Sequence, residues 1–224
     1  MINLKEYRNN EMKWLAVLYA GLYLYFCTDF VNILSNYNNL EISLVSKIFE
    51  SVFITGIIPI IVYIFDSFIS SNGKNWLLGS YIIKPYGYTV FSKIASGKFN
   101  DERVSCATAK AKYGKIISNI PHDKKLRFKY ENEKWNQLYA EVEANSAVIQ
   151  TQRDWLACRD MYVETILFTI FYLVSILIFS SISFSIELLL ILITMIIILN
   201  ICTHNKMKRF VYTVIVKDIT TKKD

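Results

Sequence analysis

Long apolar stretches alternate with polar ones along the chain, and four of the apolar stretches are long enough to cross a lipid bilayer. A transmembrane helix needs about 20 mostly apolar residues. The predicted spans cover residues 14–34, 48–69, 161–179 and 186–202. Within the last span, residues 188–199 are apolar on every helical face except at Thr194, which is unusual for a helix of a soluble protein.

The order of these stretches predicts an all-α membrane protein built from two transmembrane helical hairpins. A cytoplasmic helical insert joins the hairpins, and a long stalk helix in that insert is expected to continue directly into the third span. The predicted regions are an N-terminal segment (1–13), a first hairpin (14–69), the insert (70–160), a second hairpin (161–202) and a C-terminal tail (203–224).

Positively charged residues fall almost entirely on one side of this predicted topology. Of the 25 lysines and arginines, 24 lie in the N-terminal segment, the insert or the tail, and only Lys47 lies in a loop on the other side. Lys and Arg are retained on the cytoplasmic side of membranes. Both termini and the insert are therefore expected in the cytoplasm. The abundance of Asn, Ile and Lys is typical of an AT-rich bacterial source, so the expected location is a bacterial inner membrane.

Two helices are predicted within the insert. The first is expected to begin with an N-cap at residues 100–102 and to end before Pro121. The second is expected to run unbroken from about Asn132 into the third span, because no Gly or Pro interrupts residues 131–179. Its apolar seam recurs at spacings of three and four residues and includes the polar residues Asn145 and Gln152, which could fix register.

Two other segments leave alternatives open. Residues 75–91 mix aromatic and aliphatic residues with few charges, so they could lie in the headgroup layer or form part of a small cytoplasmic core. Residues 210–216 are rich in β-branched side chains. They could form a strand that adds to a partner's sheet edge, or simply continue the fourth helix.

Charged residues inside the first two spans are the candidates for a pore. An ionisable group in the bilayer interior costs at least about 2.5 kcal/mol at mid-helix, so it normally faces a partner or water. Asp29 and Glu50 would lie at similar depth in the first hairpin, and rings of them in an oligomer would attract cations. The alternatives are pairing with Lys47 and a position of Glu50 at the membrane interface. Gly56 and Pro59 would loosen the second span and are the candidate gating hinge.

A basic run with interleaved aromatic residues follows Pro121. Its cations are Lys124, Lys125, Arg127 and Lys129, and its aromatic residues are Phe128 and Tyr130. Such a run could bind an anionic ligand, either a nucleotide or a short nucleic acid, through charge and stacking. It could equally bind lipid headgroups or remain solvated.

Composition and motifs argue against several other classes of protein. The chain is 53% hydrophobic with a net charge of +6 and a mean hydropathy of +0.29, which excludes disordered and collagen-like classes. Its four cysteines form no CxxC pair, and no Walker loop, GxSxG or HExxH motif occurs. We therefore expect no metal site, no cofactor and no enzyme activity.

Several features follow one another along the insert: Lys84-Pro85, Pro121, the segment 131–135 and the segment 153–160. With the two hairpins, this layout resembles the four-helix membrane effectors of bacterial anti-phage systems, including those associated with oligonucleotide-synthesising cyclases. The resemblance implies an oligomeric effector that permeabilises or depolarises the inner membrane on a nucleotide or protein signal, in abortive infection.

Two functional hypotheses follow. The first is an oligomeric ion-conducting effector. Its expected partners are the lipid bilayer, further copies of itself and a nucleotide or cytoplasmic protein, and no binding to duplex DNA is expected. The second is a non-conducting membrane anchor or sensor that recruits a soluble partner through the stalk and the tail.

Overall fold

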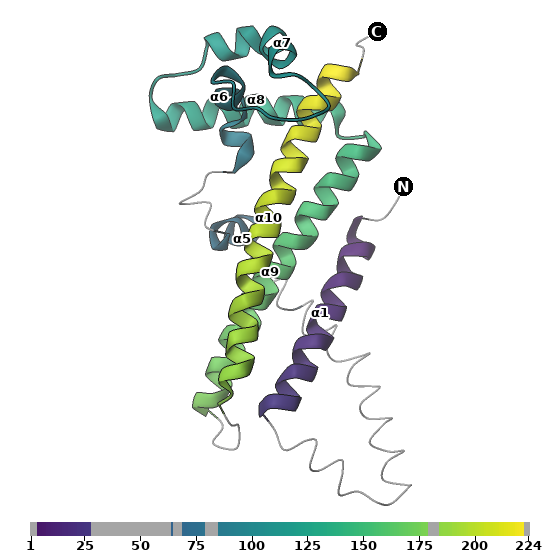
Figure 1. Cartoon of the computed structure of the whole chain (residues 1–224), viewed down its shortest axis with the longest axis vertical. Coiled ribbons are helices and arrows are strands. Elements are labelled where there is room, and N and C mark those ends of the chain that lie inside the picture. The colour runs from purple at the N-terminus through teal and green to yellow at the C-terminus, as the bar shows by residue number, and fades with distance from the viewer. Residues whose placement is uncertain (1–3, 28–63, 65–68, 79–84, 179–183, 222–224) are drawn as a thin grey trace, which may run out of the picture. The chain divides into compact units, whose positions relative to one another are not determined.

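The structure is a computed structural model that describes residues 4–27, 64, 69–78, 85–178 and 184–221. Within these residues the protein is all-helical and contains no strand, which confirms the all-α part of the predicted fold class. The elements in Figure 1 are α1 (Leu4–Cys27), α5 (Ser71–Leu77), the 3-10 helix η2 (Tyr86–Tyr88), α6 (Val90–Ala95), α7 (Cys106–Ser118), α8 (Lys124–Val142), α9 (Ser146–Ile178) and α10 (Ile186–Thr220).

Two of these helices, α9 and α10, are long and apolar enough to cross a membrane. The third predicted span falls in α9 up to Ile178, and α10 begins at Ile186, where the fourth span was predicted to begin. Helix α1 contains residues 14–27 of the first predicted span. The rest of that span and nearly all of the second span lie outside the described residues.

The chain divides into two compact units. Unit 1 comprises the described residues of Met1–Leu78 and Leu156–Cys202, and unit 2 comprises those of Gly79–Trp155 and Thr203–Asp224. Helices α9 and α10 each contribute residues to both units.

Unit 1 packs α1 alongside α9 and α10 (Figure 1). Leu15 and Tyr19 of α1 are buried against Tyr172 of α9 and Leu188 and Leu192 of α10. Hydroxyl groups of α1 and α9 form hydrogen bonds with each other, and the Tyr19 hydroxyl lies 2.8 Å from the Thr165 Oγ1. These bonds satisfy polar groups that would otherwise be buried among apolar side chains.

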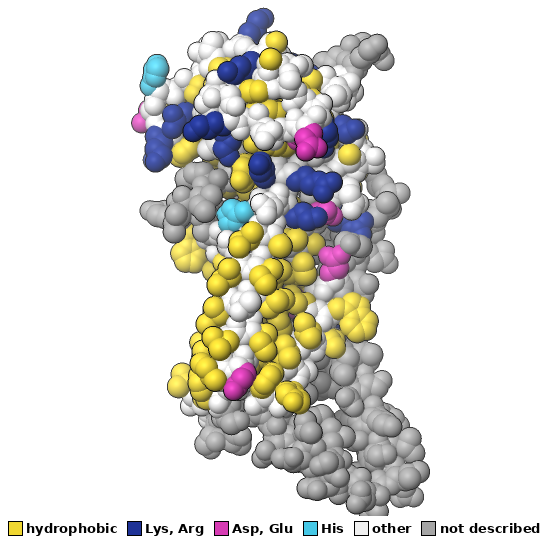
Figure 2. Space-filling model, viewed as in Figure 1, with side chains coloured by type: hydrophobic (Ala, Val, Ile, Leu, Met, Phe, Trp, Pro, Cys, Tyr) yellow, Lys and Arg dark blue, Asp and Glu magenta, His cyan; other side chains and the backbone are white. Residues whose placement is uncertain are grey.

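The outer faces of α9 and α10 in unit 1 are apolar, and the other described residues leave them exposed. Figure 2 shows hydrophobic side chains over the visible face of this unit. Leu177 is 85% exposed, and Leu190, Ile197 and Ile201 are each more than half exposed. Contiguous apolar surface of this kind is rare on soluble monomers, so these faces need lipid or another protein surface to cover them.

Unit 2 has its own core, and the end of α10 lies inside it. Phe210 to Val216 of α10 are between 0% and 4% exposed. Three aromatic rings surround Phe210: Trp155 stacks on it at 5.6 Å, while Trp135 and Tyr139 meet it edge-on at 5.5 and 5.7 Å. The helical alternative for residues 210–216 is therefore confirmed, and the strand alternative is wrong. A buried helix offers no edge to a partner's sheet.

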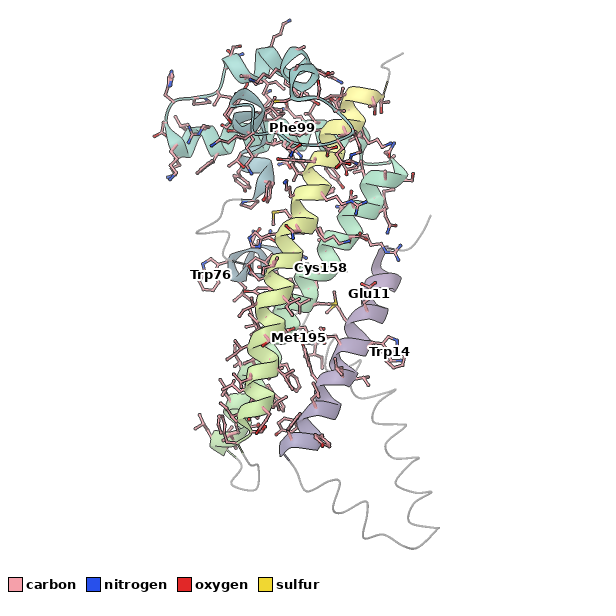
Figure 3. All side chains as sticks on the ribbon, in the orientation of Figure 1. Glu11, Trp14, Trp76, Phe99, Cys158 and Met195 are labelled. Atoms are coloured by element: carbon pink, nitrogen blue, oxygen red, sulfur yellow. The ribbon has the colours of Figure 1, made fainter. Side chains whose placement is uncertain are left out.

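Residues 85–95 belong to this same core. Val90, Phe91 and Ile94 are fully buried in it, which confirms the core alternative for this part of the 75–91 segment. The adjoining η2 packs so closely that a Cβ on Gly87 would lie 3.3 Å from the Trp135 ring. By contrast Trp76, in α5 of unit 1, is 65% exposed and points outward (Figure 3).

Side chains from distant parts of the sequence fix the short elements of unit 2. Glu131 of α8 is fully buried, and its carboxylate accepts hydrogen bonds from the Ser92 backbone N–H at 3.0 Å and from the Ser92 hydroxyl. Ser92 lies in the first turn of α6, where backbone N–H groups have no partner within the helix. The Glu131 carboxylate therefore ties α8 to the start of α6.

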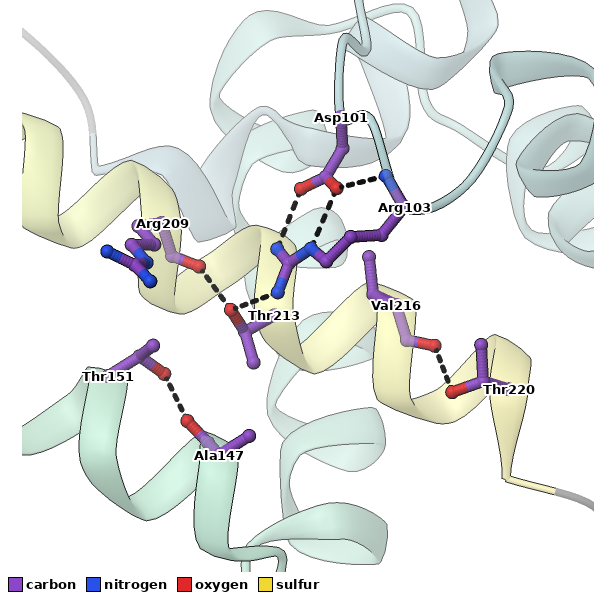
Figure 4. Close-up of polar contacts among 8 residues, drawn as sticks. All are labelled: Asp101, Arg103, Ala147, Thr151, Arg209, Thr213, Val216 and Thr220. Atoms are coloured by element: carbon purple, nitrogen blue, oxygen red, sulfur yellow. Dashed lines mark hydrogen bonds and ion pairs between the residues drawn. The ribbon is translucent and has the colours of Figure 1, made fainter.

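The predicted N-cap at residues 100–102 is wrong. Helix α7 begins at Cys106, and the Ser105 side chain caps it by accepting a hydrogen bond from the Thr108 N–H at 3.1 Å. Asp101 instead binds the Arg103 guanidinium at 2.8 Å, and Arg103 also donates to the Thr213 Oγ1 at 3.2 Å (Figure 4). This pair fastens the loop before α7 to α10.

The predicted unbroken helix from Asn132 is also wrong, because α8 ends at Val142 and α9 begins at Ser146. Asn145 stands at the break, and its side-chain Oδ1 accepts a hydrogen bond from the Ala147 N–H at 3.0 Å. It is thus the N-cap of α9 and not a seam residue inside a helix. The other polar seam residue, Gln152, accepts a hydrogen bond across the break from the Tyr139 hydroxyl at 3.1 Å. Only the part of the stalk from Ser146 onward is continuous with the third predicted span.

Replacing Asn145 with alanine is expected to lower the free energy of unfolding by about 1 kcal/mol, because α9 loses its cap, whereas glycine should cost only a few tenths. Thermal unfolding of the purified protein in detergent measures the difference. Asn136→Ala is the control, because Asn136 is an exposed residue inside α8. Alanine should be neutral or slightly stabilising there. Equal effects of the two alanine substitutions would contradict the capping role.

Candidate functional site

The basic run predicted to bind a ligand forms the start of α8. Asp123 caps this helix, and its carboxylate accepts hydrogen bonds from the Lys125 and Leu126 N–H groups at 3.0 and 2.9 Å. An open hollow of about 680 Å³ lies beside the first turns. It is lined by Tyr88 from η2, by the cap residue Asp123, and by Lys124, Lys125, Phe128, Lys129, Asn132 and Glu133 of α8.

The structure brings three of the four predicted ligand-binding cations to this hollow. Lys124, Lys125 and Lys129 line it, but Arg127 does not. Residues three and four apart share a helix face, so 125, 128, 129, 132 and 133 lie together, while a residue two positions from Lys125 or Lys129 faces elsewhere. The predicted ligand-binding role of Arg127 beside these lysines therefore stays a prediction. Its guanidinium lies 5.7 Å from the centre of the Phe128 ring.

The charges around the hollow are mixed. Three lysines face two acids, and Lys129 forms an exposed i,i+4 ion pair with Glu133 at 4.0 Å. Exposed pairs of this kind contribute little to stability. The volume falls within the range of small-molecule sites, about 300 to 1,000 Å³. The hollow therefore suits a ligand with both polar and aromatic surface better than a highly charged anion.

A second group of functional interest, in unit 1, joins α5 to α9 through buried charges. The Arg159 guanidinium donates to the Asp160 Oδ1 at 3.1 and 3.0 Å and to the Ser71 Oγ at 3.1 Å. Lys74 of α5 lies 3.4 Å from the same Asp160 oxygen. These three charged residues are at most 4% exposed. Two cations thus share one buried carboxylate where α9 passes α5.

In the sequence the segment 153–160 was noted only as part of the layout of the insert, and its partners in α5 were not predicted. Arg159 is long enough to curl back to Asp160, and both also reach α5. Asp154 instead reaches α10, where it binds the Lys206 Nζ at 2.8 Å. The only sequence signal was the presence of acids and bases at the edge of an apolar stretch.

A third buried group lies in unit 2, between α7 and the end of α10. The Tyr113 hydroxyl donates to the Asp218 Oδ2 at 2.5 Å, and the Lys112 Nζ lies 3.0 Å from the same oxygen. Burial and the Asp218 carboxylate raise the pKa of Tyr113. This phenol, held in its neutral form by a carboxylate and packed into the core of unit 2, fastens α7 to α10.

The predicted pore and hinge residues, Asp29, Glu50, Gly56 and Pro59, lie outside the described residues. In the described part of the chain, no group of three or more His, Cys, Asp or Glu side chains is placed to hold a metal ion.

No family model, curated protein or solved structure matches this chain.

Proposed function

We propose that this protein is an oligomeric, membrane-spanning effector whose cytoplasmic helical unit controls an ion-conducting path through the lipid bilayer. One observation carries the proposal: α9 and α10 each have an apolar part in unit 1 and a second part built into unit 2. A ligand or protein that binds unit 2 therefore acts on residues of the same helices that cross the bilayer. No separate coupling element is needed.

The membrane part of the proposal is supported by the apolar faces of α9 and α10 that the other described residues leave exposed. The orientation is supported by charge, because unit 2 carries 19 Lys and Arg against 10 Asp and Glu. Figure 2 shows this concentration of basic side chains over unit 2. Unit 2 is then the cytoplasmic part, in a multi-pass protein of the bacterial inner membrane.

The conducting path is assigned to the first hairpin, with Asp29 and Glu50 as its acidic lining and Gly56 and Pro59 as its hinge. A single copy has too few helices to enclose a pore, so the path requires several copies. A signal can open it only by binding the open state more tightly than the closed state. The layout shared with four-helix anti-phage effectors makes depolarisation of an infected cell the biological setting.

Asp29→Ala is expected to reduce potassium flux through protein-containing vesicles about tenfold, because an acidic ring raises the local concentration of cations. Flux is measured with a potassium-sensitive dye, and membrane insertion is checked by resistance to alkaline extraction. Glu102→Ala is the control: it removes one exposed carboxylate from unit 2, outside the predicted first hairpin.

Equal flux through wild-type and Asp29→Ala vesicles would contradict the pore assignment. Wild-type flux no greater than that of protein-free vesicles would contradict conduction altogether. In that case the non-conducting anchor would become the better description, with unit 2 as its binding part.

A further inference from the structure

Two lysines from distant parts of unit 2 meet around a pair of tyrosine rings. The Lys93 Nζ of α6 lies 3.8 Å from the centre of the Tyr86 ring, and the Lys208 Nζ of α10 lies 5.4 Å from the centre of the Tyr212 ring. The two rings touch edge to face, with centres 6.3 Å apart. Both ammonium groups therefore lie on one aromatic cluster, each against the face of a ring.

Neither lysine forms an ion pair with an acid in the described part of the chain, and the acids nearest to them are already engaged. Asp101 is bound by the Arg103 guanidinium through both carboxylate oxygens, at 2.8 Å each (Figure 4). This pairing lowers the pKa of Asp101. Glu131 is bound by the backbone and hydroxyl of Ser92. The nearby negative charges are thus used to fasten loops and helices.

The positive charges of Lys93 and Lys208 repel each other. Burial lowers the pKa of Lys93, and the positive charge of Lys208 lowers it further, while Glu131 opposes the shift. Both lysines are only half-exposed, so water screens their repulsion incompletely. An anion between them would remove this repulsion and would be attracted by both charges.

We propose that Lys93 and Lys208 form a binding site for a phosphate group. A phosphate group carries one negative charge as a diester and up to two as a monoester, and its several acceptor oxygens can accept hydrogen bonds from two ammonium groups at once. The phosphate could belong to a lipid headgroup or to a soluble compound. The site is independent of ion conduction and differs from the hollow on α8, where acids offset the lysines.

The soluble source is tested with full-length protein in a nonionic detergent at low, fixed salt. Pyrophosphate is titrated into the protein by calorimetry. Lys93→Gln and Lys208→Gln are each expected to raise the Kd about 10- to 100-fold, the range typical of one lost charge-assisted bond. Lys98→Gln and Arg209→Gln are the matched controls, because both residues are exposed neighbours and each change removes one positive charge. They should leave the Kd nearly unchanged.

The lipid source is tested in a second arm. The same five proteins are exposed to mixed micelles containing phosphatidylglycerol, and native mass spectrometry counts the lipid molecules retained. If the site holds a headgroup, the two site variants lose one bound lipid and the controls do not. If the two site variants bind pyrophosphate more weakly but retain as many lipids as the controls, the ligand is a soluble phosphate compound.

Stability without ligand separates a binding site from a packing role. Removing one of two like charges offsets the loss of one cation–π contact, so the melting temperature should change little. Lys93→Arg should retain binding because it keeps the charge. The proposal is overturned if neither arm distinguishes the site variants from the controls. It is equally overturned if both glutamine variants melt well below the wild type without ligand, since the lysines would then serve packing.

Discussion

Replacing Asp160 with alanine is expected to destabilise the protein by about 3 to 5 kcal/mol, which is the cost of breaking a buried ion pair by removing one partner. The Asp160 side chain is fully buried, and it faces Arg159 and Lys74, whose side chains are 5% and 6% exposed. Without the carboxylate, two positive charges remain close together in a medium of low polarity. Ser71 can hold the guanidinium but cannot neutralise it.

Asp154→Ala provides the comparison on the same helix. Asp154 also forms one ion pair, with Lys206, but these side chains are 22% and 37% exposed. Partly exposed pairs contribute about 0 to 1 kcal/mol, so this variant should lose at most that amount. Chemical unfolding in detergent, followed by circular dichroism, measures both. Similar losses of unfolding free energy for the two variants would show that burial of Asp160 adds nothing to the cost of removing its carboxylate.

Phe210→Ala is expected to lower the free energy of unfolding of unit 2 by about 3 to 5 kcal/mol, the usual range for truncating a buried aromatic side chain. Phe210 is 3% exposed and contacts Trp135, Tyr139 and Trp155. Its loss leaves a cavity at the meeting point of α8, α9 and α10. Because two of its neighbours are tryptophans, their fluorescence should also shift towards that of solvated indole.

Ile201→Ala is the matched control on α10. Ile201 is 56% exposed, so its truncation leaves no cavity and should change the unfolding free energy in detergent by less than about 1 kcal/mol. If Phe210→Ala unfolds at the same denaturant concentration as the wild type, the position of α10 in the core of unit 2 is wrong. Unchanged tryptophan fluorescence would support that conclusion independently.

Local signals in the sequence predicted several helix boundaries well. Ile186 was predicted to start the fourth span, and α10 begins there because Ser185 accepts a hydrogen bond from the Leu188 N–H at 3.1 Å. A helix was predicted to end before Pro121, and α7 ends at Ser118. The start of the next helix was misplaced: it was predicted at about Asn132, but α8 begins at Lys124, capped by Asp123. Such signals act over one helical turn, and they can be read without knowing the rest of the fold.

The break between α8 and α9 was missed because the apolar seam continues through it. Trp135, Leu138 and Val142 keep a regular spacing with the residues that follow, although a turn intervenes. The deciding residue was Asn145, which is a poor helix former and a good N-cap. Regular spacing alone does not distinguish one long helix from two packed ones.

The buried charge group and the lysine pair could not be predicted because their members are far apart in sequence. Lys74 meets Asp160, and Lys93 meets Lys208, only after the helices have packed. No pattern among neighbouring residues in the sequence predicts contacts of this kind. For the ligand-binding run, helical periodicity would have separated Arg127 from Lys125 and Lys129 once the run was assigned to a helix.

The place of Phe210 to Val216 inside unit 2 has a consequence for biosynthesis. Residues 85–155 leave the ribosome first, and about 55 more residues, including the two apolar helices, must follow before Phe210 appears. At typical translation speeds this delay lasts roughly 3 to 11 seconds. During that time the nascent segment exposes the apolar surface that α10 later covers, so it is prone to aggregation until α10 has been synthesised.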